Sequence, residues 1–264
     1  MSAAPETAPA AAALLAWAAG ELRAAGVPEP DADAELLVDD ALRRLKEDVG
    51  RRAVREPLAY VRGEVVFRGL RLAVDERVFV PRPETELLVE ATLAVPHGAA
   101  VLEPCTGSGA VALALKCKRP DLRVTATDHS PAAIAVARAN AARLGLEVSF
   151  FVASGIAGAP GGPWGAIVSN PPYVGESEAG AGSLPPELEN HEPPDAFWAG
   201  EDGLAVYRRL AGELACSAPV FLALEVGDRQ ADAVCALLAP ARLYCTRRLA
   251  APSGAIRVVV AERS

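Results

Sequence analysis

From residue 99 onward, short apolar runs alternate with segments of helical periodicity, and this alternation limits the possible folds more than any other feature of the chain. Strands that alternate with helices form a mostly parallel sheet covered on both faces. The expected strands are 99–102, 122–126, 148–152, 166–169, 220–225, 242–247 and 256–260, and the expected helices are 110–116, 131–144, 204–215 and 228–238. The tight loop Pro252–Gly254 predicts that the last two strands form an antiparallel hairpin at one edge of this α/β sheet.

The first 98 residues show a different pattern. Residues 1–9 consist mostly of Ala and Pro, and we expect them to be disordered. Residues 10–55 have helical spacing that Pro28-Glu29-Pro30 interrupts, which predicts two helices. Short apolar runs at 64–67 and 70–74, joined by Arg68-Gly69, predict a hairpin, and a helix should follow at 84–93. We therefore expect a small helical N-terminal domain (1–58), a β-hairpin linker (59–82) and an α/β domain (83–264).

Composition and charge argue against several classes of protein. The chain of 264 residues has a formal net charge of −8, whereas general nucleic-acid binders carry a basic face. The apolar stretch 10–19 is too short to cross a bilayer and lacks the basic flank of a signal peptide. Five cysteines without C-x-x-C spacing and three separated histidines argue against a disulfide framework and a metal site. We expect a soluble, cytoplasmic protein that uses no metal, nucleic acid or membrane; the sequence does not define its oligomeric state.

A glycine-rich loop, residues 103–109, lies between the first expected strand and its helix. Gly107 and Gly109 allow a sharp turn and a close approach of the backbone to a ligand. Asp128 ends the next strand about twenty residues later, where its carboxylate can accept both hydroxyls of a ribose. This order predicts a nucleotide cofactor at the carboxyl ends of the strands. It fits a nicotinamide dinucleotide and S-adenosylmethionine equally well.

The tip of the strand at 166–169 separates these two cofactors. It carries Asn170-Pro171-Pro172-Tyr173, in which two prolines fix the backbone and restrict Asn170 to extended geometry. The Asn170 side-chain oxygen and the Pro171 carbonyl could accept two N–H bonds from one planar nitrogen group, with Tyr173 against its face. Such a clamp suits an N-methyltransferase acting on an amide or a guanidinium, and a dehydrogenase has no need of it. The alternative is an ordinary proline-rich loop.

Over residues 55–262 the chain resembles the HemK/PrmC family of protein-(glutamine-N5) methyltransferases, which act on peptide-chain release factors. The matching segments are 55–60 (Arg-Glu-Pro-Leu-Ala-Tyr), 81–86 (Pro-Arg-Pro-Glu-Thr-Glu), 106–109, 170–173, 191–193 and 200–204. The resemblance implies a class I, Rossmann-like methyltransferase domain with a seven-stranded sheet and S-adenosylmethionine as cofactor. It also implies that the Pro-Arg-Pro segment lines the cofactor pocket.

The motifs and the resemblance together define the expected site. The residues expected to bind the cofactor are Arg82, Glu103, Cys105, Thr106, Gly107, Gly109, Asp128, His129, Ser154, Gly155 and Asn170. Those expected to act in catalysis are Asn170, Pro171 and Tyr173, and those expected to contact the substrate are Pro172, Glu192, Asp195 and Glu225.

Three departures from the family pattern bear on the substrate. The stretch between Leu36 and Pro57 is shorter by about one helix, the glycine loop begins Glu103-Pro104-Cys105, and no acid stands at 153–155 to hold the adenine amine. They favour a divergent paralogue. Our main interpretation is an N-methyltransferase of the glutamine-N5 type that acts on an amide or guanidino nitrogen. The alternatives are an N-methyltransferase of a free amino acid or small metabolite such as arginine, with release-factor methylation weak or absent, and a protein that binds the cofactor without catalysis.

Overall fold

The computed structural model describes residues 8–178, 184–217 and 219–263. Contacts divide the chain into two compact units, Met1–Glu56 and Pro57–Ser264. The β-hairpin therefore belongs to the larger unit, and the further separation of a linker at 59–82 stays a prediction. None of the described helices is long and apolar enough to cross a membrane.

The smaller unit contains two helices, α1 (Ala8–Ala24) and α2 (Pro30–Ala53). The break at 28–30 is predicted correctly because Pro30 has no N–H donor and occupies the first turn of α2. Ala8 and Pro9 already belong to α1, so our expectation of disorder was wrong for these two residues, and residues 1–7 lie outside the described part.

Little apolar surface is buried within this smaller unit. Ala19, Ala34 and Val38 are buried, whereas Trp17 is 62% exposed and Leu36 is 70% exposed. Leu37, Leu45 and Val49 are also exposed. Two helices alone cannot surround side chains of this size, so the unit keeps an apolar face.

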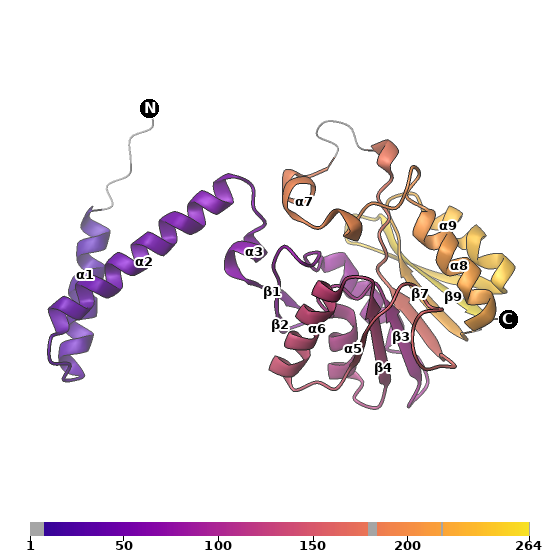
Figure 1. Cartoon of the computed structure of the whole chain (residues 1–264), viewed down its shortest axis with the longest axis horizontal. Helices are drawn as coiled ribbons and strands as arrows, with labels where there is room; N and C mark the ends of the chain where they lie inside the picture. The colour runs from indigo at the N-terminus through magenta and orange to yellow at the C-terminus, as the bar shows by residue number, and fades with distance from the viewer. Residues whose placement is uncertain (1–7, 179–183, 218, 264) are drawn as a thin grey trace. The chain divides into compact units, whose positions relative to one another are not determined.

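The larger unit is built on a seven-stranded sheet with the order β5-β4-β3-β6-β7-β9-β8 (Figure 1). Its strands are β3 (Ala100–Pro104), β4 (Arg123–Asp128), β5 (Ser149–Val152), β6 (Ala166–Ser169), β7 (Phe221–Glu225), β8 (Leu243–Ala250) and β9 (Ile256–Arg263). Neighbouring strands are parallel except for β9, which is antiparallel to both β7 and β8. The predicted α/β class and the antiparallel C-terminal edge are confirmed.

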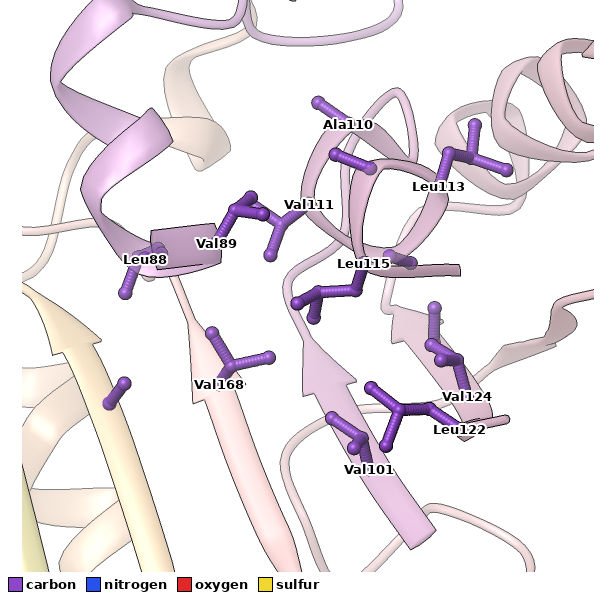
Figure 2. Packing of buried hydrophobic residues seen from close by; sticks show 14 of the residues in the cluster. Leu88, Val89, Val101, Ala110, Val111, Leu113, Leu115, Leu122, Val124 and Val168 are labelled. Atoms are coloured by element: carbon purple, nitrogen blue, oxygen red, sulfur yellow. The ribbon is translucent and has the colours of Figure 1, made fainter. Parts of the chain in front are cut away.

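Helices cover both faces of this sheet, because each buried strand presents apolar side chains alternately to the two sides. On β6, Ala166 and Val168 join one core cluster and Ile167 joins the other. The first cluster includes α4 (Glu86–Thr92), α5 (Ala110–Lys118) and α6 (Pro131–Leu144). The second includes α8 (Ala205–Ser217) and α9 (Ala231–Leu238). Figure 2 shows Val89 of α4 and Val111 of α5 pointing toward each other in the first cluster.

A short helix and a hairpin precede the sheet: α3 (Leu58–Arg62), β1 (Glu64–Phe67) and β2 (Leu70–Ala73). Asn140 of α6 fixes the hairpin, since its side chain accepts from the Ala73 N–H (2.7 Å) and donates to the Ala73 carbonyl (3.0 Å). The Tyr60 hydroxyl donates to the Val78 carbonyl, which holds the segment that leads to Pro81. The hairpin thereby determines where residues 77–85 lie.

Several features were not expected from the sequence. They are α3, α7 (Pro186–His191) and the short 3-10 helices Pro83–Thr85, Glu176–Glu178, Pro194–Ala196 and Ala239–Ala241. Cys235 of α9 and Cys245 of β8 form a disulfide with a Cα–Cα distance of 5.8 Å, although their spacing matches no disulfide motif. The tight turn at 239–241 brings these two cysteines together, and sequence spacing alone does not reveal such a turn.

Candidate active site

A cavity of about 810 Å³ lies at the carboxyl ends of β3, β4, β6 and β7. Glu103, Asp128 and Glu225 reach it from β3, β4 and β7, and Asn170 reaches it from the residue after β6. Ligands in open α/β sheets bind at this edge, where neighbouring crossovers leave in opposite directions. The cavity is therefore the candidate active site.

Most of the predicted site residues meet here. The lining includes Arg82, Glu103, Cys105, Thr106, Gly107, Asp128, His129, Asn170, Pro171, Pro172, Tyr173, Asp195 and Glu225. Four predicted residues are absent from the lining: Gly109, Ser154, Gly155 and Glu192.

Asp128 is held in place by the glycine loop. Its Oδ2 accepts from the Gly107 N–H and its Oδ1 accepts from the Ser130 N–H, both at 3.0 Å. Gly107 has φ +54°, and a Cβ there would meet no atom within 4 Å, so the backbone presents open space to the cavity. Each carboxylate oxygen has a second lone pair. The His129 Nδ1 lies 3.4 Å from Oδ1, and Oδ2 keeps an acceptor position for a further hydrogen bond, such as that of a ribose hydroxyl.

Glu103 is a buried carboxylate in the wall of the cavity. Its Oε2 accepts from the Thr106 hydroxyl (2.7 Å) and from the Ala112 N–H (2.9 Å). Burial raises the pKa of Glu103 to about 8, and these two hydrogen bonds only partly oppose that rise. A cationic ligand in the cavity would favour the charged form of this residue.

Contacts on both sides fix the Asn170–Tyr173 turn. Ser169 donates its hydroxyl to the Pro104 carbonyl at 2.7 Å, which joins the tips of β6 and β3. Asn170 donates its Nδ2 to the Thr85 hydroxyl at 3.2 Å. The Tyr173 carbonyl accepts from the Gln230 side chain at 2.9 Å, and a Cβ on Gly203 would lie only 2.4 Å from that carbonyl. The turn is therefore rigid at both ends.

Arg82 and Glu192 form an ion pair although they are far apart in sequence. The Glu192 side chain is fully buried, and it also accepts from the Val80 N–H at 2.9 Å. The Arg82 guanidinium lies 4.6 Å above the ring of Phe79. Glu192 thus holds residues 80–82 in place without lining the cavity itself, whereas Arg82 is part of the lining.

The other predicted residues outside the lining have different surroundings. Gly109 has φ +83°, and a Cβ there would lie 3.2 Å from Ala137 and Leu113, so this glycine allows α5 and α6 to pack closely. The loop after β5 turns toward α8, because the Ile156 and Ala157 N–H groups donate to Glu213. A Cβ on Gly155 would collide with the same Glu213 carboxylate. The structure therefore does not place Ser154 and Gly155 among the cavity-lining residues.

Two lining residues that sequence reasoning did not propose are Thr85 and Arg257. Thr85 lies within the Pro-Arg-Pro-Glu-Thr-Glu motif, so the motif pointed to its neighbourhood. Arg257 is the second residue of an edge-hairpin strand, and nothing in the sequence marks it as part of a site. Its position depends on β9 lying antiparallel to β7, where Val258 pairs with Glu225.

The sheet, the glycine loop and Asp128 at the β4 tip form a nucleotide site, and the Asn170–Tyr173 turn after β6 identifies it as that of a class I S-adenosylmethionine-dependent methyltransferase. A Methyltransferase small domain model matches residues 83–182. The crystal structure of a methyltransferase from Pyrococcus furiosus shares the fold, with a TM-score of 0.56 and 17% identity over 85% of this chain and 98% of that one.

Sequence relatives are more specific. The release factor glutamine methyltransferase of Deinococcus radiodurans is 41% identical over 85% of this chain and 88% of its own length. The release factor glutamine methyltransferase of Rhodospirillum rubrum is 38% identical over 85% of this chain and 76% of its own length. The chain belongs to the release factor glutamine methyltransferase family, as the motifs had indicated.

The residues in the cavity fit S-adenosylmethionine. Asp128 keeps an acceptor position on Oδ2 for a ribose hydroxyl, and Gly107 leaves open space for a close approach. The buried Glu103 carboxylate offers the negative partner that an ammonium group needs in a low-dielectric wall.

Replacing Asp128 by alanine should weaken S-adenosylmethionine binding by about 1.5–3 kcal/mol, the usual scale for hydrogen bonds to a charged group. Titration calorimetry measures the change. Asp121→Ala is the matched control, since Asp121 also accepts a glycine N–H, that of Gly98 at 2.9 Å, but does not line the cavity. Unchanged affinity in the Asp128 variant would remove this residue from the cofactor site.

The buried Glu103 should make the free protein less stable as the pH rises. Its pKa is about 8 in the folded state and that of an ordinary glutamate when unfolded, so the folded state holds the proton more tightly. This contribution to the free energy of unfolding is complete below about pH 4.5 and is lost as the pH rises to about 8. Denaturant unfolding at several pH values gives the free energy of unfolding as a function of pH. Between about pH 4.5 and 8, this free energy should fall less steeply with pH for Glu103→Gln than for wild type. The exposed Glu147→Gln should keep the wild-type slope.

Proposed function

We propose that this chain methylates the side-chain amide of a glutamine in a peptide-chain release factor. The observation that carries the proposal is the rigid Asn170–Tyr173 turn in the wall of a cavity that fits S-adenosylmethionine. The relatives with that substrate in their names match this chain over most of its length. Such an enzyme works where release factors work, in the cytoplasm.

The acceptor clamp addresses the weakness of an amide as a nucleophile. S-adenosylmethionine, when bound, supplies a methyl group on a positively charged sulfur. The Asn170 Oδ1 and the Pro171 carbonyl accept the two N–H groups of the amide and hold the nitrogen in place. Fixed acceptors of this kind act by positioning and by stabilising the positive charge that develops on the nitrogen. Tyr173 offers its ring as the flat wall beside the planar group.

The smaller unit supports a protein as the acceptor. Leu14, Trp17 and Leu37 expose apolar side chains around one shallow apolar hollow there, and contiguous apolar patches mark surfaces for protein partners. A free amino acid needs no such surface. The short stretch between Leu36 and Pro57 therefore does not by itself favour the small-metabolite hypothesis.

A methylation assay tests the proposal. Purified bacterial release factor and isotopically labelled S-adenosylmethionine are incubated with the enzyme, and mass spectrometry locates the label. We expect one labelled peptide that contains a methylated glutamine, and no product from free glutamine or free arginine in the same mixture. A methylated small molecule with an unmodified release factor would favour the metabolite alternative. Cofactor binding without any methylated product would favour the non-catalytic one.

A further inference from the structure

Three arginines line the cavity: Arg77, Arg82 and Arg257. Two of them have acidic partners. The Arg77 guanidinium donates to both carboxylate oxygens of Asp75, at 2.8 and 2.6 Å, and Arg82 forms an ion pair with Glu192. The Arg257 side chain has no ion pair or hydrogen bond within the part of the chain that the structure describes, and its Nε is buried without an acceptor. Arg257 therefore brings an unpaired positive charge to the cavity wall.

A buried guanidinium nitrogen without a partner does not by itself indicate a site. Arg263, on the same strand, also has a buried Nε that lacks an acceptor among the described residues. However, the Arg263 Nη2 donates to the Ala241 carbonyl, and Arg263 does not line the cavity. What distinguishes Arg257 is that its unpaired donors belong to a residue of the cavity lining.

The backbone fixes Arg257 at the end of the sheet. Its carbonyl accepts the Val226 N–H at 2.8 Å. The next residue, Val258, is buried and pairs with Glu225 at the end of β7. On its other side β9 pairs with β8. Hydrogen-bonded strands on both sides thus fix the point from which the guanidinium reaches the cavity.

The place of β9 in the sheet indicates which ligand Arg257 can meet. An arginine side chain has five N–H donors and no acceptor, so its partner must be an oxygen such as that of a carbonyl or a carboxylate. β9 lies two strands from β6, which Asn170 follows, and three strands from β3, which contains Glu103. At about 4.8 Å per strand, these separations are about 10 and 14 Å. Arg257 therefore lies nearer to the amide clamp than to the carboxylate that suits the cofactor ammonium group.

We propose that Arg257 binds the main-chain carbonyl oxygen of the glutamine that is methylated, and so forms a second subsite beside the amide clamp. The inference rests on the proposed function, which supplies a glutamine residue as the acceptor. When Asn170 and Pro171 hold the side-chain amide, the main-chain atoms of the same residue lie farther along the cavity. An extended glutamine and the long arginine side chain together bridge the distance between β6 and β9. A free amino acid would place a carboxylate oxygen in the same position.

Steady-state kinetics of Arg257→Met test the subsite. Methionine keeps an apolar stem and removes the donors, so the KM for release factor should rise about 10–100-fold, the scale of a hydrogen bond to a charged group. The contact is the same before and during methyl transfer, so kcat should be almost unchanged. Arg257→Lys, which keeps a charged donor, should recover part of the loss. Arg263→Met, on the same strand, is the matched control and should keep the wild-type KM.

Two further measurements separate this role from others. The melting temperature of Arg257→Met should not fall, because the side chain loses no hydrogen bond or ion pair within the described residues. The Kd of S-adenosylmethionine should stay at the wild-type value. A higher cofactor Kd would mean that Arg257 binds the carboxylate of the methyl donor. A lower melting temperature with an unchanged KM would mean that its role is structural. Either result would overturn the proposal.

A binding experiment with two small probes does not depend on methyl transfer. Acetyl-glutamine methylamide contains one glutamine residue with its main-chain carbonyl, and 4-acetamidobutanamide is the same molecule without that carbonyl and its methylamide. Saturation-transfer NMR in the presence of S-adenosylhomocysteine should show that wild type binds the first probe about 10-fold more tightly. Arg257→Met should bind both probes alike. Equal binding of the two by wild type, or no binding of either, would overturn the subsite even if release factor is methylated.

The subsite and the proposed function can fail separately. If wild type methylates release factor and Arg257→Met keeps the wild-type KM, only the subsite is wrong. If wild type methylates free glutamine but not release factor, and Arg257→Met raises the KM for free glutamine, Arg257 binds the carboxylate of a free amino acid and only the proposed function fails. If neither is methylated, the proposed function fails and the two probes decide whether the subsite exists.

Discussion

Replacing Asn170 by alanine should lower kcat for methyl transfer about 10²–10³-fold, or about 2–4 kcal/mol in the barrier. In the proposed clamp the side-chain oxygen is one of two fixed acceptors for the nucleophilic amide, and the alanine methyl group cannot replace it. Folding should be nearly unaffected, because the side chain is only partly buried and, among the residues that the structure describes, it hydrogen-bonds to Thr85 alone. Rates measured at saturating cofactor and release factor report the change.

Three control measurements show whether the loss of activity is specific to the Asn170 side chain. The melting temperature and the S-adenosylmethionine affinity of Asn170→Ala should stay close to wild type. Asn190→Ala, at an exposed position on α7, should keep full activity. Tyr173→Phe should be milder than Tyr173→Ala, since the ring rather than the hydroxyl forms the flat wall. Wild-type turnover in Asn170→Ala would show that the amide is not held by this residue.

Replacing Gly203 by alanine should damage both stability and activity, although Gly203 does not line the cavity. Its φ is +72°, and an added Cβ would lie 2.4 Å from the Tyr173 carbonyl and 3.0 Å from the Gly175 nitrogen. Backbone atoms cannot move aside without displacing the Tyr173 end of the clamp. A left-handed backbone costs alanine about 1–2 kcal/mol by itself, and overpacking adds about 1–3 kcal/mol.

Gly69→Ala separates the two contributions to this loss. Gly69 has φ +81°, but a Cβ added there would meet no atom within 4 Å, so alanine at this position introduces the backbone strain without the collision. Denaturant unfolding should show a larger loss for Gly203→Ala, and only that variant should lose at least tenfold in kcat. Equal losses of stability and unchanged activity in both variants would mean that Gly203 does not support the clamp.

Local signals in the sequence predicted most of the fold. The helix at 131–144 is correct to the residue because Ser130 caps it, Pro131 starts it and Gly145 ends it in the left-handed region. The strand at 166–169 is also correct, since its continuous apolar run ends at two prolines. The helix α7 was missed because 186–191 has no buried residue to give an apolar periodicity.

The site was predictable as far as it depends on strand tips. Glu103, Asp128, Asn170 and Glu225 each follow or end an apolar run, and parallel strands bring their carboxyl ends together. Contacts that depend on packing between distant segments could not be predicted. The pairing of Arg82 with Glu192 spans 110 residues, and that of Thr85 with Asn170 spans 85. The sequence around each of these residues contains no signal that predicts its distant partner.

The strand order has a consequence for how such an enzyme can diversify. Since β6 inserts beside β3, the residues that line the cavity, apart from Arg257 of β9, come from two separate stretches. In the proposed function, 77–133 faces the cofactor and 170–230 faces the acceptor. Each stretch is continuous in the gene, so recombination or a run of mutations can alter the acceptor wall while the cofactor wall is inherited intact. A chimaera that takes 170–230 from a relative would exchange the specificity of the enzyme and keep its methyl donor.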